Sequence, residues 1–194
     1  KVKDLPQEDP LFQLVSARFS AQKSYTFSAA DQDDVSELTT FFRKVRPIFP
    51  GSPALEVAYY GSSAFDVNSL TELNVVRDQI VKLNLSRMPL QDADLSLLAD
   101  FQNLELLYLN FTSLTGNQLK ALINLPKLEV LAISGNTLDE EGIKALISMR
   151  KLRHLYLWQT GLKEQQKNQL SKALSTTQLD FGYEGEGVIY ALNS

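Results

Sequence analysis

The apolar positions of this chain repeat at a fixed step of 24 residues between Ile80 and Leu162. Five sets of residues share this step: Leu83, Leu107, Leu131 and Leu155; Leu85, Leu109, Ile133 and Leu157; Leu90, Leu114, Leu138 and Leu162; Leu98, Leu122, Leu146 and Leu170; and Leu104, Leu128 and Leu152. Each unit begins with two alternating apolar positions and continues with apolar positions three or four apart. The alternation predicts a short strand, and the wider spacing predicts a helix.

A strand, a turn and a helix repeated every 24 residues are typical of a leucine-rich repeat. The predicted fold class is therefore α/β, a leucine-rich-repeat solenoid with a parallel concave sheet and convex helices. One unit cannot fold alone, because burying about seven apolar side chains contributes roughly 1.5–3 kcal/mol each, whereas ordering each of its residues costs about 1–2 kcal/mol. Neighbouring units must supply the remaining contacts.

The chain divides into four parts on this pattern. They are a linker at residues 1–13, degenerate repeats or a cap at 14–79, the regular repeats at 80–178, and a C-terminal strand and cap at 179–194. The last part contains Glu184 and Glu186 between glycines, and we interpret it as a cap because its spacing fits neither a phosphate-binding loop nor a calcium loop.

In the N-terminal part, Tyr25 and Phe27 alternate with polar neighbours, which predicts a short strand. A helix is predicted next, because a capping sequence at residues 28–31 precedes a helical stripe and Pro47 ends it. The stripe consists of Val35, Leu38, Phe42 and Val45. A strand through Leu55, Val57 and Tyr59 and a helical stretch through Leu70, Leu73 and Val76 are predicted to follow.

Polar residues mark the turns of the regular units. Thr115 and Gln118 form a capping box, and Asp139 begins a run of acids that favours a helix start. Thr112, Asn136 and Thr160 occupy the turn position at which a repeat of this kind hydrogen-bonds neighbouring backbone, so we expect them to be structural.

The residues between the inward leucines should lie on the concave face. They form three rows: Lys82, Leu106, Val130 and His154; Asn84, Tyr108, Ala132 and Tyr156; and Ser86, Asn110, Ser134 and Trp158. Because Tyr and Trp often anchor interfaces, we predict a partner-binding surface made of Leu106, Tyr108, Asn110, Val130, Ser134, His154, Tyr156 and Trp158, with Phe111 at its border.

Three occupants of this surface stay open at this stage. The aromatic residues can pack against one another or against a sister domain of the same protein, or they can bind a separate protein. Tyr156 and Trp158 can also stack on a sugar ring, although few polar groups converge there. The predicted function is a non-catalytic scaffold for protein interactions. The alternatives are a stand-alone adaptor or effector and a carbohydrate-binding module.

Composition narrows the chemistry. His154 is the single histidine, and the rows place no acid beside it, so the sequence predicts no catalytic triad and no enzyme. The chain has no cysteine and a net charge of −4, which argue against a thiolate nucleophile, a cysteine-bound metal and a nucleic-acid partner. No apolar run approaches the roughly 20 residues that span a bilayer, so we expect no membrane insertion by this chain. The chain lacks a starting Met, and we interpret it as a piece of a longer or processed protein.

The repeat pattern resembles short bacterial leucine-rich repeats of the GALA and ribonuclease-inhibitor type. Three segments, Val45–Val57, Lys82–Ser86 and Leu152–Thr160, are similar to the C-terminal repeat region of bacterial membrane-anchored cytochrome c proteins. The resemblance implies a cell-envelope domain on the periplasmic side, anchored through an upstream membrane region, and a parent protein active in electron transfer. It implies a c-type haem in an upstream domain and no cofactor here, because this chain has no C-x-x-C-H motif.

Overall fold

The computed structural model of the protein describes residues 23–182, and its strands form one seven-stranded sheet in sequence order. They are β1 (Arg43–Pro47), β2 (Leu55–Tyr59), β3 (Ile80–Asn84), β4 (Leu106–Tyr108), β5 (Val130–Ala132), β6 (His154–Tyr156) and β7 (Gln178–Asp180). β1 pairs with β2 in antiparallel fashion, and the pairs from β2–β3 to β6–β7 are parallel. The chain is therefore an α/β protein with a mixed sheet.

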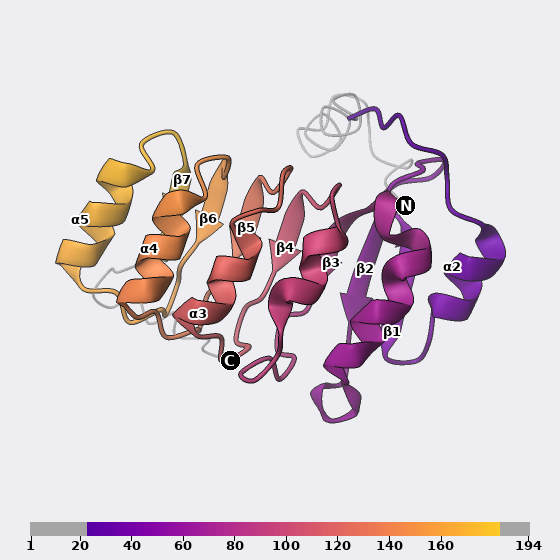
Figure 1. Cartoon of the computed structure of the whole chain (residues 1–194), viewed down its shortest axis with the longest axis horizontal. Helices are drawn as coiled ribbons and strands as arrows, with labels where there is room; N and C mark the ends of the chain where they lie inside the picture. The colour runs from indigo at the N-terminus through magenta and orange to yellow at the C-terminus, as the bar shows by residue number, and fades with distance from the viewer. Residues whose placement is uncertain (1–22, 183–194) are drawn as a thin grey trace, which may run out of the picture.

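Helices connect the parallel strands and lie along one face of the sheet (Figure 1). They are α2 (Gln32–Leu38), η2 (Ser62–Ala64), η3 (Val67–Gln79), η4 (Leu95–Asp100), α3 (Gly116–Leu119), η5 (Lys120–Leu122), α4 (Glu140–Ser148) and α5 (Glu164–Ala173), where η denotes a 3-10 helix. Strands β3 to β7 start at the upper edge of the sheet in Figure 1, where the preceding helix ends. The two edges of the sheet therefore carry different ends of the helices.

The 24-residue step is confirmed as the register of the sheet. Lys82, Leu106, Val130, His154 and Gln178 are successive partners across β3 to β7. The leucines at the two alternating positions point inward, and each is almost fully buried from Leu83 to Leu157. Full burial of such a side chain contributes roughly 1.5–3 kcal/mol, so the repeated leucines form one continuous core.

The helical stretch predicted through Leu70, Leu73 and Val76 is confirmed as the 3-10 helix η3. These three apolar residues are spaced by three, which is the number of residues in one 3-10 turn, so all three side chains face the core and are buried. Asp66 begins this helix, and its Oδ1 accepts a hydrogen bond from the backbone N–H of Asn68 at 2.9 Å.

The single helix predicted to run through Val45 is wrong in its second half. Helix α2 begins after Asp31, whose Oδ1 accepts from the N–H of Asp33, and it ends at Leu38. The next regular element is the strand β1, which begins at Arg43. In this strand Arg43 and Val45 are buried and their neighbours are exposed. Because β1 is an edge strand, Pro47 can stand in it without removing a ladder hydrogen bond from the interior.

The buried Arg43 side chain holds α2 and β1 in this arrangement. Its Nε donates to the carbonyl oxygen of Leu38 at the end of α2, at 2.6 Å. Its guanidinium also donates to Tyr59 Oη at 3.3 Å and to Ser69 O at 3.2 Å, and pairs with Glu72 at 2.7 Å. A buried charge is costly unless it is fully bonded, so these contacts fix the turn from helix to strand.

The strand predicted at Tyr25 and Phe27 is wrong, and two further predicted segments cannot be compared with the structure. Residues 23–31 contain no strand, although the rings of Tyr25 and Phe27 contact each other with centroids 5.3 Å apart. The C-terminal strand predicted to open the part at 179–194 is β7, and the predicted cap beyond Gly182 lies outside the described residues, as does the linker at residues 1–13.

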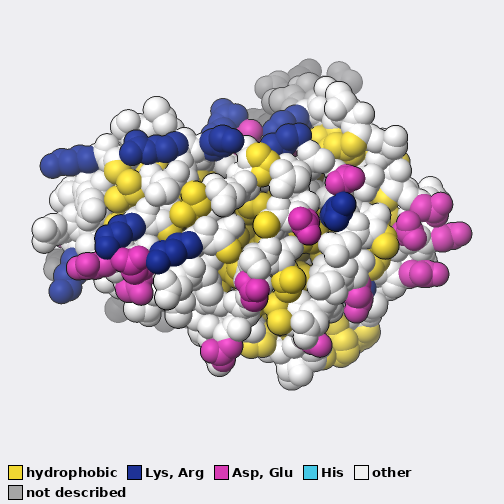
Figure 2. All heavy atoms as spheres, viewed as in Figure 1, with side chains coloured by type: hydrophobic (Ala, Val, Ile, Leu, Met, Phe, Trp, Pro, Cys, Tyr) yellow, Lys and Arg dark blue, Asp and Glu magenta, His cyan; other side chains and the backbone are white. Residues whose placement is uncertain are grey.

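The helix face has a polarised surface. Figure 2 shows Lys and Arg side chains along the upper edge and also beside acidic side chains on the lower left, whereas Asp and Glu side chains lie mainly toward the lower and right-hand edges. Part of this pattern follows from helix capping, because Asp66, Asp94 and Asp139 each cap the first turn of a helix with a side-chain oxygen. The capping box of Thr115 and Gln118 is also confirmed.

Asn136 is the most densely bonded of the structural turn residues. Its Oδ1 accepts from the backbone N–H groups of Thr112 at 3.1 Å and Leu114 at 3.0 Å, and its Nδ2 donates to Leu109 O at 2.7 Å and Ile133 O at 2.9 Å. Thr112 and Thr160 instead donate to carbonyl oxygens of their own turns, at 2.8 Å and 2.7 Å. The predicted structural role of all three positions is confirmed.

We predict that Asn136→Ala lowers the free energy of unfolding by about 3 kcal/mol, because it leaves several buried backbone groups of two units without partners. Urea unfolding followed by circular dichroism measures this loss. The exposed Asn124 provides a control, and Asn124→Ala should change stability by no more than about 0.5 kcal/mol. A loss below about 1 kcal/mol for Asn136→Ala would show that the turns do not depend on this side chain.

Candidate functional site

The sheet face opposite the helices carries the residues predicted to bind a partner. Strand register places Leu106, Val130 and His154 side by side in one row, and Tyr108, Ala132 and Tyr156 side by side in the next. Trp158 follows β6, and Phe111 follows β4. We call this surface, from β4 to β7, the exposed sheet face.

Burial differs among these side chains. Trp158 is 48% exposed, and Tyr156 and Phe111 are each 38% exposed. The remaining predicted residues are half-buried, apart from Ser134: Leu106, Tyr108, Asn110, Val130 and His154. The most accessible apolar area therefore lies toward the ends of the strands, at the aromatic residues.

Ser134 departs from its prediction because it is buried and is not available to a partner. It belongs to a ladder in which one polar side chain per unit accepts from backbone in the next unit. Ser86 Oγ accepts from the N–H of Asn110 at 3.3 Å, Asn110 Oδ1 accepts from that of Ser134 at 2.9 Å, and Ser134 Oγ accepts from that of Trp158 at 3.2 Å. Ser134 thus fixes the backbone of Trp158.

Phe111 and Trp158 form an edge-to-face pair with ring centroids 6.4 Å apart. Phe111 lies in a turn whose equivalent residues, Arg87, Gly135 and Gln159, all have a positive φ of 55–73°. The Phe111 ring packs directly over Gly135, where a Cβ atom would stand 2.1 Å from the ring. The Trp158 ring packs in the same way over Gly182. Glycine one unit further along the sheet makes room for each ring.

Charged groups border the aromatic residues on the side of β1 to β3. Glu56 on β2 pairs with Arg46 at 3.3 Å and with Lys82 at 3.1 Å. The Lys82 ammonium lies 5.6 Å from the centre of the Tyr108 ring, and the Arg87 guanidinium lies 5.2 Å from that of Phe111. These distances allow cation–π attraction, so the cations help to orient the rings.

His154 has no carboxylate neighbour in its row, because its register partners are Val130 and Gln178. Among residues 23–182, no cluster of three or more His, Asp or Glu side chains could hold a metal ion. The residues in the row of His154 therefore do not form a hydrogen-bonded triad of nucleophile, base and orienting acid.

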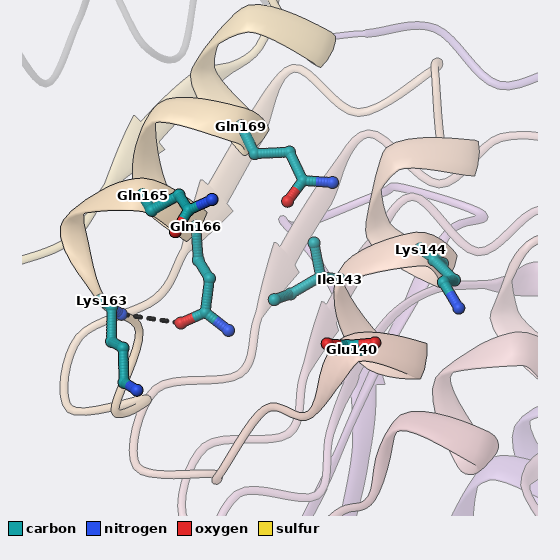
Figure 3. A pocket seen from close by; sticks show the side chains of 7 residues that line it. All are labelled: Glu140, Ile143, Lys144, Lys163, Gln165, Gln166 and Gln169. Atoms are coloured by element: carbon teal, nitrogen blue, oxygen red, sulfur yellow. Dashed lines mark hydrogen bonds between the residues drawn. The ribbon is translucent and has the colours of Figure 1, made fainter.

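The helix face carries a pocket of about 420 Å³ between α4 and α5. Figure 3 shows its lining side chains: Ile143 of α4 points toward the glutamines of α5, whereas Lys144 of the same helix points away from them. Gln166 Oε1 is used in capping α5, since it accepts from the backbone N–H of Lys163 at 2.8 Å. Glu141, also on α4, forms salt bridges with Lys120 and Lys144, both at 2.8 Å. These two ammonium groups lower the pKa of Glu141 to about 2.

Sequence reasoning missed Arg87 and Gly135 as parts of the site. Their signal was present, because both stand at the same repeat position as Phe111, and a glycine one unit after an aromatic residue leaves space for its ring. Contact between Tyr25 and Glu105, 80 residues apart, carried no comparable signal.

Comparisons with known proteins add no family assignment: no protein-family model matches the chain, and no curated protein matches it in sequence. Within the described part of the chain, no helix is long and apolar enough to cross a membrane.

We predict that Gly135→Ala displaces the Phe111 ring and with it the edge contact to Trp158. Gly161→Ala is the matched control, because Gly161 has a similar φ of +70° but no atom within 4 Å of the added Cβ. Both variants should lose about 1 kcal/mol through backbone strain, whereas only Gly135→Ala should lose a further 1 kcal/mol or so from ring displacement.

The fluorescence of Trp158, the single tryptophan, reports the displacement directly. Its emission should change in Gly135→Ala more than in Gly161→Ala. Equal stability and equal emission in the two variants would mean that Phe111 does not pack over residue 135.

Proposed function

We propose that this chain is a leucine-rich-repeat solenoid module, without catalytic activity, that binds a protein partner through its exposed sheet face. The 24-residue register of parallel strands, the inward leucines and the asparagine-bonded turns support the repeat assignment. Repeat modules of this kind bind along an extended face of the stack, because every unit contributes equivalent outward positions.

The observation that carries the proposal is the group of partly exposed aromatic side chains Tyr156, Trp158 and Phe111 beside the apolar Leu106 and Val130. An interface typically has an apolar, aromatic centre with a polar border. Here the Arg46, Glu56 and Lys82 network borders the apolar residues on one side. The Phe111 and Trp158 rings, which pack over Gly135 and Gly182, also lose little conformational freedom on binding.

We predict that Tyr156→Ala with Trp158→Ala reduces partner binding by about 30-fold or more, the loss expected when interface anchors are removed. Immobilised wild-type protein and variants would be incubated with extract of the native source, and the retained proteins quantified by mass spectrometry. Phe41→Ala with Val75→Ala is the control, because both side chains are exposed but lie outside this face.

Proteins retained by the wild type and the control but lost from the double variant support the proposal. Equal retention by all three proteins contradicts it. Thermal melts separate binding from folding: a fall in melting temperature of more than about 10 °C in the double variant would place these side chains in the core instead of an interface.

On the sequence resemblance alone, we also propose that the module is the accessory domain of a membrane-anchored c-type cytochrome and faces the periplasm. Haem would be held by an upstream domain of that parent protein. Native protein captured with an antibody to this module should then show a Soret absorption band and an intact mass well above 21.8 kDa. A colourless species near that mass would contradict the cytochrome assignment and leave the repeat module unaffected.

A further inference from the structure

A second candidate surface lies at the upper edge of the sheet, where residues 23–27 cross the starts of β4 and β5. Lys23 Nζ pairs with Glu105 at 2.9 Å and with Glu129 at 3.4 Å. Tyr25 Oη donates to the second carboxylate oxygen of Glu105 at 3.2 Å. Burial and the Glu105 charge raise the pKa of the Tyr25 phenol, so it stays a hydrogen-bond donor.

This crossing segment forms one wall of a groove of about 460 Å³, which we call the rim groove. The paired rings of Tyr25 and Phe27 belong to that wall, and Lys127, Lys151 and Arg153 also line the groove. Arg153 is strongly exposed, and both lysines are also exposed. The groove therefore combines an aromatic wall with three accessible cations.

Neutral oxygens hold the two lysines in place without cancelling their charge. Lys127 Nζ donates to Asn103 Oδ1 at 2.6 Å, and Lys151 Nζ donates to Pro126 O at 3.0 Å. Nearby, Arg150 donates to Ala173 O at 3.1 Å. Each of these contacts joins one unit to a neighbour, so the cations are positioned by the repeat itself.

The carboxylates of the groove are already matched. Glu105 has an 8% exposed side chain and is bonded by Lys23 and Tyr25, and Glu129 is shared by Lys23 and by Arg153 at 3.8 Å. Three cations on the rim, Lys127, Arg150 and Lys151, have carbonyl or amide partners instead. The upper edge is accordingly basic, although the whole chain has a net charge of −4 (Figure 2).

We propose that the rim groove binds a segment of a partner protein rich in Asp and Glu. The groove already shows the chemistry required, because Lys23, Tyr25 and Arg153 bind carboxylates of this chain. A phosphate backbone suits it less well, since the half-exposed Glu129 and the acidic lower edge repel a long polyanion. The aromatic wall can receive an apolar residue of the same segment.

The lining of the rim groove shares no residue with the exposed sheet face, and the proposal does not depend on the function proposed there. The probe is a fluorescein-labelled twelve-residue peptide in which Glu alternates with Ala and one central Tyr. The same peptide with Gln in place of every Glu is the matched probe. Fluorescence anisotropy with the full chain should show binding of the Glu peptide that weakens with added salt, and much weaker binding of the Gln peptide.

The variant Lys127→Gln with Lys151→Gln and Arg153→Gln should weaken binding of the Glu peptide roughly tenfold or more, since three ion pairs of modest strength are lost. The control removes the same number of positive charges elsewhere, through Arg77→Gln, Lys144→Gln and Lys163→Gln, and should change the affinity about twofold at most. Thermal melts verify that both triple variants are folded.

Three results would overturn the proposal. The first is no binding of the Glu peptide at low salt, and the second is an equal loss in both triple variants, which would indicate unspecific charge attraction. The third is tighter, rim-dependent binding of a twelve-residue oligo(dT) or of phosphatidylserine vesicles than of the peptide, which would assign the groove to nucleic acid or to a lipid surface.

Discussion

The structure depends on one constraint: from β3 to β7, each strand pairs with the strand 24 residues further along the chain. Backbone hydrogen bonds across β3 to β7 fix this step, so every side chain lies beside its own counterpart in the next unit. Repeated leucines can then fill one core at nearly complete burial. Polar groups must follow the same rule, and Asn136 does so by bonding backbone in two adjacent turns.

The same constraint shapes the exposed sheet face. Asn110 and Ser134 each accept a hydrogen bond from the backbone of the next unit. These bonds hold the backbone, and the rings of Phe111 and Trp158 project from it. Space for those rings comes from glycine in the following unit, at Gly135 for Phe111 and at Gly182 for Trp158. The aromatic surface is therefore built from relations between units and not from any one unit.

Charge is also sorted by the repeat. Because each helix starts at one edge of the sheet and ends at the other, acidic capping residues collect at one edge. At the other edge, Arg150 bonds the last carbonyl group of α5, and Lys151 bonds a carbonyl group of the loop that follows η5. The two edges thereby gain opposite electrostatic character without a large net charge. The exposed sheet face and the rim groove consequently differ in chemistry, since the first is mainly aromatic and the second carries several cations.

The sequence by itself determined the inward leucines, the register of the parallel strands and the rows of outward residues, because a 24-residue period leaves one way to bury all the leucines together. It did not determine the end of α2, since the spacing through Val45 fits a helix and the alternation from Arg43 fits a strand. Tertiary contacts of the buried Arg43 guanidinium decide between them. Tertiary structure also decided the burial of Ser134 and the contact of Tyr25 with Glu105, because both arise from neighbours distant in the chain, which local periodicity does not encode.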